Sequence, residues 1–229
     1  MRYALLLGLS GALACVERAE PARERERAGA EPADSAASAM PVVLFLGTSL
    51  TAGLGLSESE AYPALIQRKL DSAGLRFRVI NAGESGGTSA GGLRRIDWLL
   101  RQPVSVLVLE LGANDALRGQ DLDATRRNLQ GIIDRTRAAY PDAEVVIAGM
   151  QAPPNLGERY AGEFQAMFPE LARRNRAALI PFLLDGVAAV PGLNQADGIH
   201  PSARGQERLA HNVWTVLEPV LSAMERRRR

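Results

Sequence analysis

The stretch 42–50, which reads VVLFLGTSL, decides the fold of this chain. Its first five residues are apolar and mostly branched, as in a strand that is buried on both faces of a parallel sheet. Gly47 ends the apolar run, and Ser49 follows two residues later. Open α/β sheets build their sites at the carboxyl ends of such strands. The stretch therefore predicts a strand over 42–46 with a hydroxyl at its functional end, although an ordinary Gly-Thr-Ser turn would read the same.

The rest of the chain alternates between short apolar runs and segments of helical periodicity. The apolar runs predict strands over 42–46, 77–80, 104–111, 145–148 and 179–184, the last at an edge because Pro181 cannot donate to a ladder. Helices are predicted after a capping box at Ser57 and Glu60, after Thr88, over 121–139, around 164–171 and over 202–223. This order predicts an α/β fold in which helices cover both faces of a mostly parallel five-stranded sheet.

The N-terminal segment is predicted to direct export. Arg2 precedes an apolar run over 4–13 that is too short to span a bilayer, so residues 1–14 are expected to be a signal peptide. Cys15 follows directly, as in a bacterial lipoprotein lipobox, although a plain Ala-x-Ala cleavage site fits the same residues. Residues 15–40 are polar and predict a flexible tether. We expect a periplasmic protein or a membrane-anchored lipoprotein of a bacterium.

Length and composition bound the remaining possibilities. The chain has 229 residues, and we expect one domain over 41–223 followed by a solvated basic tail over 224–229. The net charge of +1 gives no reason to expect a nucleic-acid partner. The single cysteine, Cys15, excludes an internal disulfide and a thiolate metal site in the domain. We expect a monomer without metal or cofactor, with membrane contact only through a lipid on Cys15.

Serine chemistry requires a base, and the chain offers two histidines. His211 faces away from the apolar stripe of the last helix, which is typical of a surface histidine. His200 lies in a loop three residues after Asp197, whose carboxylate could bond one imidazole nitrogen and leave the other for Ser49. The same letters also fit a loop before a helix in which Asp197 and His200 only satisfy backbone groups.

An acyl-transfer site also requires donors for the developing oxyanion. The backbone N–H groups of Ser49 and Gly86 are candidates, because glycine lets the backbone approach a ligand closely. The side-chain amide of Asn114 is a third candidate. Each of these residues taken alone is equally typical of an ordinary turn.

Four sequence blocks in this order resemble the SGNH (GDSL-type) hydrolase superfamily, particularly its bacterial lysophospholipase, thioesterase and arylesterase branch. The resemblance covers 42–221, and its blocks are Gly47-Thr48-Ser49-Leu50, the glycine Gly86, Gly112-Ala113-Asn114-Asp115 and Asp197-Gly198-Ile199-His200-Pro201. It implies a flavodoxin-like three-layer α/β/α sandwich. It also implies a nucleophile at Ser49, a base at His200 and an orienting acid at Asp197.

The resemblance further implies where substrate binds. Segment 113–120 would correspond to a substrate-responsive loop, and the loop 151–157 would lie on the rim of the pocket. Substrate contacts are therefore expected at Ala113, Asp115, Leu117, Gln151 and Pro153. One residue departs from the family pattern: Thr48 stands where the signature aspartate is usual. We expect this departure to alter hydrogen bonding in the loop and to leave activity intact.

The resulting hypothesis is a serine esterase that hydrolyses acyl or aryl esters, thioesters or lysophospholipids through an acyl-enzyme on Ser49. A carbohydrate O-acetylesterase and a non-catalytic, tethered binding protein of the same fold remain alternatives. A nucleotide-binding protein is disfavoured because the loop after the first strand lacks a phosphate-binding lysine. A metal-dependent hydrolase is disfavoured because His200 has no histidine partner.

Overall fold

The computed structural model describes residues 40–152 and 154–228. The expectations for the signal peptide, for Cys15 and for Pro153 fall outside these residues. The described chain begins with Met40 and Pro41 and enters the first strand directly. None of the helices in this part of the chain combines the length and apolar character needed to cross a membrane.

Five strands form one sheet, and every pair of neighbours runs parallel. The strands are β1 (Val42–Gly47), β2 (Arg78–Gly83), β3 (Val106–Glu110), β4 (Glu144–Ala148) and β5 (Ala178–Ile180), in the spatial order β2-β1-β3-β4-β5. All six residues of β1 are buried, as its uninterrupted apolar pattern predicts. The register pairs Gly47 with Gly83 on one side and with Glu110 on the other, which brings three strand ends together.

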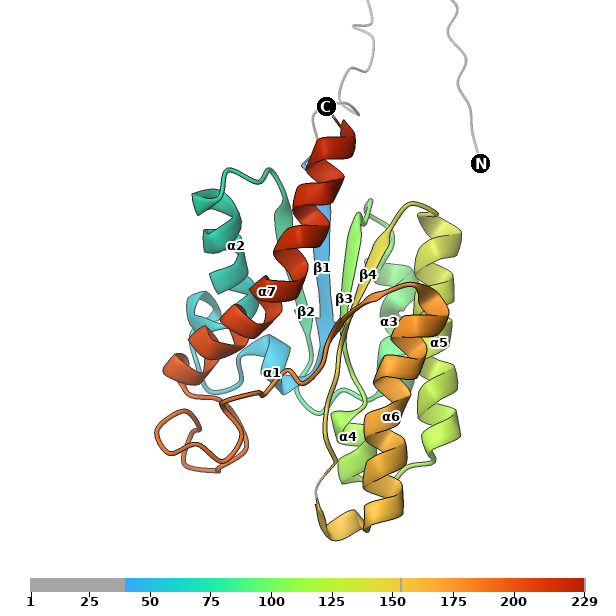
Figure 1. Cartoon of the computed structure of the whole chain (residues 1–229), viewed down its shortest axis with the longest axis vertical. Coiled ribbons are helices and arrows are strands. Elements are labelled where there is room, and N and C mark those ends of the chain that lie inside the picture. The colour runs from blue at the N-terminus through green and yellow to red at the C-terminus, as the bar shows by residue number, and fades with distance from the viewer. Residues whose placement is uncertain (1–39, 153, 229) are drawn as a thin grey trace, which may run out of the picture. The chain divides into compact units, whose positions relative to one another are not determined.

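Helices cover both faces of this sheet (Figure 1). On one face, α2 (Tyr62–Ser72) packs against α7 (Ala203–Arg228). On the other face, α5 (Leu122–Ala139) packs against both α3 (Ser89–Leu99) and α6 (Glu158–Asn175). The expected α/β sandwich with a five-stranded parallel sheet is therefore confirmed.

Short helical turns occupy the connections at the carboxyl ends of the strands. They are α1 (Ser49–Ala52), η1 (Glu58–Glu60), α4 (Ala113–Leu117) and η2 (Pro154–Leu156). Ser57 and Glu60 form the expected capping box, but this box lies at the start of the 3₁₀ turn η1 and not at the start of a long helix. Helix α2 begins only at Tyr62. The cap at Thr88 lies where the sequence places it, and its hydroxyl accepts from Gly91 N.

Several boundaries differ from the prediction. Strand β5 ends at Ile180, although the apolar run predicted a strand over 179–184. Two further differences have clear physical reasons. Strand β2 continues through Gly83 because Ala82 and Gly83 pair with the end of β1, although their small side chains suggested a loop. Helix α7 runs on to Arg228, where the sequence suggested a solvated basic tail. Met224 is buried there and Arg227 pairs with Glu144, so this final turn is packed against the domain.

Candidate active site

Ser49 is the first residue of α1, directly beyond the carboxyl end of β1 (Figure 1). Thr48 caps this short helix, and its hydroxyl accepts from Leu50 N at 3.3 Å. Gly53 ends the helix in a left-handed conformation. Four residues between a cap and a glycine form a tight turn, which holds Ser49 in place beyond the carboxyl end of β1.

The structure brings Ser49, His200 and Asp197 together. His200 Nε2 lies 2.9 Å from Ser49 Oγ, across 151 positions of the sequence. His200 Nδ1 lies 2.6 Å from Asp197 Oδ2. The imidazole therefore bridges the hydroxyl and the carboxylate, and the three residues expected to act together form one continuous hydrogen-bonded chain.

The loop that carries His200 is fixed by its own acid. Asp197 Oδ1 accepts from the backbone N–H groups of Ile199 and His200, both at 2.9 Å. Gly198 takes the left-handed φ of 70° that this tight turn requires. The hydrogen bond to the His200 side chain, together with these backbone N–H groups, lowers the pKa of Asp197 to about 2. Asp197 is therefore ionised at neutral pH and holds His200 Nδ1 as a donor.

Two glutamines that no sequence motif marked join this loop to the turn that carries Ser49. Gln195 Nε2 donates to Leu54 O at 2.7 Å and to Pro201 O at 2.9 Å. Gln206, which is buried on α7, donates to Leu50 O at 3.1 Å. These bonds connect the two halves of the site, and their amide side chains gave no sequence signal that distinguishes them from surface residues.

A buried carboxylate lies directly beneath the turn that carries Ser49. Glu110 on β3 is fully buried and accepts from Thr48 N at 2.8 Å and from Thr51 Oγ1 at 2.7 Å. Burial raises the pKa of Glu110 to about 7, even though these hydrogen bonds act in the opposite direction. The sequence contained a signal for this residue, because an acid within an otherwise apolar strand is buried and must find partners.

The candidate oxyanion donors lie in the adjoining loops. Asn114, on α4, donates through Nδ2 to Gly87 O at 2.9 Å, and its side chain lines the same cavity as Ser49. Gly86 adopts a left-handed φ of 75° in the neighbouring loop. Gly86 does not line that cavity, and its carbonyl accepts from Arg118 Nη2 at 3.2 Å.

Arg95 on α3 fastens the glycine loop to the end of β1. Its Nη2 donates to Gly47 O at 3.2 Å, and its Nε lies 3.3 Å from a carboxylate oxygen of Glu84. Glu84 N donates to the same Gly47 carbonyl at 3.0 Å. Arg95 therefore helps to position both backbone segments that carry oxyanion candidates, a role that one arginine in a helical pattern did not reveal.

Ser49 lies in the wall of a cavity of about 680 Å³. His200 lies in the same wall, and most of the other wall residues are apolar. The larger apolar side chains are Leu50, Leu117, Met150, Leu156, Phe182, Leu184 and Ile199. Leu117 and Ile199 are each more than half exposed, which places apolar surface at the mouth of the cavity.

Only some of the residues expected to contact substrate line this cavity. Ala113, Leu117 and Gln151 line the cavity, whereas Pro153 falls outside the described residues. Asp115 does not line the cavity and is fully buried. Its carboxylate accepts from Ser89 N at 2.8 Å and from Ser89 Oγ at 2.6 Å. This carboxylate anchors the beginning of α3, and the substrate contact expected at Asp115 stays a prediction.

Known proteins resemble this chain over most of its length. The model of the GDSL-like Lipase/Acylhydrolase family matches residues 45–208. Esterase TesA of Pseudomonas aeruginosa is 43% identical over 185 residues, covering 80% of this chain and 91% of its own length. Thioesterase 1/protease 1/lysophospholipase L1 of Escherichia coli is 39% identical over 188 residues, covering 81% of this chain and 88% of its own length.

A solved structure also resembles this chain in fold and sequence. The crystal structure of AlinE4, an SGNH-hydrolase family esterase, superposes with a TM-score of 0.66 at 41% identity. The match covers 80% of this chain and 97% of AlinE4. Family model, relatives and structure agree in identifying the chain as a member of the GDSL-like lipase/acylhydrolase family of SGNH hydrolases.

Proposed function

We propose that this protein is a serine esterase that hydrolyses carboxylic esters through a covalent acyl-enzyme on Ser49. The hydrogen-bonded chain from Ser49 Oγ through both nitrogens of His200 to Asp197 carries this proposal. Its distances of 2.9 and 2.6 Å lie within the reach that proton transfer requires. The hydrolases among the relatives support the same class of reaction.

In the first step, Ser49 Oγ attacks the acyl carbonyl carbon while His200 Nε2 takes the hydroxyl proton. The tetrahedral intermediate collapses, His200 gives the proton to the leaving alkoxide, and the acyl group stays on Ser49. In the second step, water attacks the acyl-enzyme with the same histidine as base, and the free acid leaves. Asp197 keeps Nδ1 protonated in both steps and stabilises the imidazolium that forms.

The intermediate carries its negative charge on the former carbonyl oxygen. We assign the donors to the backbone N–H groups of Ser49 and Gly86 and to the Asn114 amide. Asn114 supports this assignment best, because it lines the cavity beside Ser49 and its amide is already oriented by Gly87 O. An oriented amide loses little entropy when charge develops, which is what makes such donors effective.

The substrate class follows from the cavity. Its apolar wall favours an acyl or aryl group over a saccharide, so we propose acyl and aryl esters, thioesters and lysophospholipids as substrates. The relatives named as esterase and as thioesterase and lysophospholipase support this range. The apolar wall also disfavours a carbohydrate O-acetylesterase, which needs polar side chains for its sugar.

We further propose that the protein is exported, with residues 1–14 as the signal peptide. Lipidation at Cys15 is proposed with it, on the lipobox-like residues that precede this cysteine. Residues 15–40 would then serve as the tether. Mass spectrometry of the mature protein in membrane fractions tests both points: an unmodified Cys15 excludes the lipid, and an intact N-terminus excludes the signal peptide.

A panel of p-nitrophenyl esters, acyl-CoA thioesters, a lysophospholipid and acetylated sugars tests the proposed activity. We expect turnover of acyl esters by the wild type and loss of that turnover in Ser49→Ala. Turnover of the acetylated sugars alone would contradict the proposed substrate class. Equal rates for wild type and variant would contradict the serine mechanism.

A further inference from the structure

Positive and negative charges separate between the amino ends and the carboxyl ends of the strands, although the net charge of the whole chain is only +1. At the amino ends of the strands lie segments 73–78, 100–105, 137–144, 173–177 and 224–228, which we call the arginine edge. They contain ten arginines and three carboxylates. The loops that follow the strands, 48–61, 84–88, 111–121, 149–158 and 181–202, contain eight carboxylates and one arginine.

The arginine edge is exposed and largely unpaired. All of its arginines except Arg137 are exposed. Within the described residues, only Arg227 of this set forms an ion pair, with Glu144. Helix C-termini favour cations, which accounts for the sign of the charge. The helix dipoles alone do not require so many arginines without acidic partners. This excess of positive charge indicates an anionic partner outside the chain.

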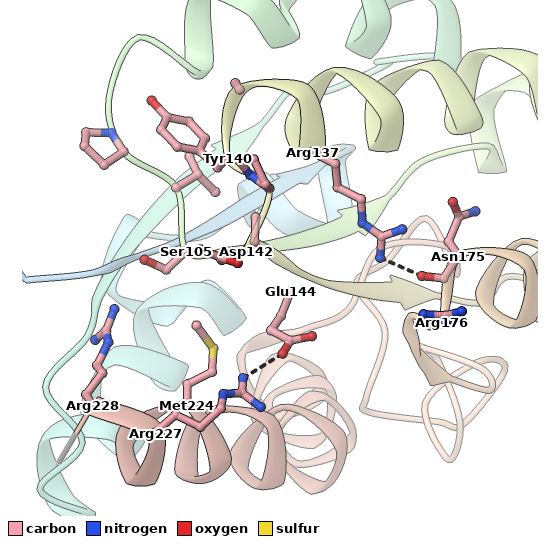
Figure 2. A pocket seen from close by; sticks show the side chains of 15 residues that line it. Ser105, Arg137, Tyr140, Asp142, Glu144, Asn175, Arg176, Met224, Arg227 and Arg228 are labelled. Atoms are coloured by element: carbon pink, nitrogen blue, oxygen red, sulfur yellow. Dashed lines mark hydrogen bonds and ion pairs between the residues drawn. The ribbon is translucent and has the colours of Figure 1, made fainter.

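A hollow of about 960 Å³ lies within this edge (Figure 2). Arg137, Arg176, Arg227 and Arg228 surround it from three different helices or helix ends. Arg137 donates to Asn175 O, and Arg228 lies over the ring of Phe77 at 5.3 Å. The guanidinium groups are thus spread around a concave surface, where they match an array of anions better than a single small ion.

Exposed apolar side chains flank the same edge. Trp98, in the last turn of α3, is 65% exposed, and Met40, directly before β1, is 46% exposed. Tryptophan and arginine together are typical of surfaces that rest in the headgroup region of a bilayer. The described chain also begins at this edge, so an attachment through the N-terminal segment would join the domain here.

From these observations we infer that the arginine edge docks on a membrane surface of anionic phospholipids. Anionic headgroups supply the array of phosphates that distributed arginines attract, and the attraction falls off within a Debye length of about 8 Å. Strand β1 has six residues, so the site at its far end lies roughly 20 Å away. The acidic loops therefore lie too far from the anionic headgroups to be strongly repelled by them. The catalytic cavity opens away from the bilayer.

Vesicle sedimentation of the full chain, carrying Cys15→Ser to prevent lipidation, tests the inference. The vesicles consist of phosphatidylglycerol and phosphatidylcholine, or of phosphatidylcholine alone as the neutral control. One variant removes three charges from the arginine edge: Arg173→Gln, Arg174→Gln and Arg226→Gln. The matched control removes three exposed charges elsewhere: Arg94→Gln, Arg127→Gln and Arg204→Gln. None of these side chains takes part in a hydrogen bond or ion pair within the described residues.

We expect the protein to prefer anionic vesicles and the edge variant to partition at least about tenfold more weakly, since each arginine near such a surface contributes. The control variant should stay within about twofold of the wild type. Equal losses in the two variants, or equal binding to anionic and neutral vesicles, would overturn the inference. Tighter binding to duplex DNA than to anionic vesicles, with the same arginine dependence, would also overturn it.

Trp98 reports the orientation. In a Trp214→Phe variant it is the only tryptophan left, and its emission should shift to the blue on anionic vesicles. An unchanged spectrum of bound protein would contradict the proposed orientation. Sedimentation and fluorescence need no turnover, so their outcome and that of the proposed esterase activity are independent. Bound enzyme should hydrolyse a water-soluble ester at the rate of the free enzyme.

Discussion

The hydroxyl of Thr48 donates to the carboxylate of Glu110, 3.0 Å from either oxygen. Thr48 immediately precedes Ser49, whereas Glu110 belongs to the neighbouring strand β3. Thr51, two residues after Ser49, donates to the same carboxylate at 2.7 Å. The turn that presents Ser49 is therefore held on both sides by one buried acid, which fixes the serine from below.

Glu110→Gln should change how stability depends on pH. Burial raises the pKa of Glu110 from 4.5 to about 7, so the folded protein binds this proton more tightly than the unfolded chain does. The contribution of protonated Glu110 to the free energy of unfolding is complete below about pH 4.5. It is lost as the pH rises through about 7, a change of roughly 3 kcal/mol. Glutamine resembles the protonated acid and should remove this slope. Urea unfolding of both proteins at pH 4.5 and 7.5 measures it, and parallel slopes would contradict the assignment.

Thr48→Asp restores the usual family residue but places a second carboxyl beside Glu110. Two carboxylates at this distance cannot both ionise in a buried site, so the pair should retain a shared proton. We expect the variant to lose stability more steeply than the wild type between pH 6 and 8. Thermal unfolding across that range gives the comparison. If kinetics and stability are unchanged, the departure at position 48 is neutral, and the expected repulsion between the two carboxyl groups is contradicted.

Asp197→Asn should lower kcat by roughly 10² to 10⁴ while KM changes little, because asparagine cannot hold His200 in the same tautomer or stabilise its charge. The pKa of Asp197 is lowered to about 2, chiefly by its bond to His200. This carboxylate should therefore stay ionised throughout the working range, and it should not shape the wild-type pH–rate profile above about pH 4. A profile governed by Asp197 near neutrality would contradict the arrangement.

Leu117→Ser tests the apolar mouth of the cavity. Leu117 is 55% exposed and lines the cavity that holds Ser49, so a long acyl chain would cover it. Loss of this contact should raise KM for a p-nitrophenyl octanoate about tenfold and leave p-nitrophenyl acetate almost unaffected. Steady-state kinetics on the two esters provide the measurement. An equal effect on both would show that Leu117 acts on folding or loop position instead.

The sequence was sufficient to predict the alternating strands and helices, because apolar runs have direct local causes. Strand β5 lies at an edge as expected, but it ends at Ile180, before the Pro181 on which that expectation rested. The sequence was less reliable where tertiary contacts decide. Gly83 belongs to a strand only because β1 pairs with it, and Met224 is helical because the end of α7 packs on the domain. Local propensity carries no information about such partners.

The candidate site shows the same division. Ser49, Asp197 and His200 could be selected because serine chemistry requires these residue types, and the fold brings them together. Asp115 bonds to Ser89 in the structure, and the sequence reads the same whether such a carboxylate faces substrate or anchors a helix. Arg95 and Gln206 act through contacts between distant elements and have no pattern of their own.

The most direct test of the account is covalent labelling of the active serine by a fluorophosphonate, followed by mass spectrometry of the labelled peptide. The wild type should carry a single adduct on Ser49, and labelling should be lost in Ser49→Ala and slowed in Asp197→Asn. Turnover of p-nitrophenyl esters by Ser49→Ala should fall by several orders of magnitude. An unlabelled Ser49 in an active enzyme, or an adduct on another residue, would contradict the proposed acyl-enzyme.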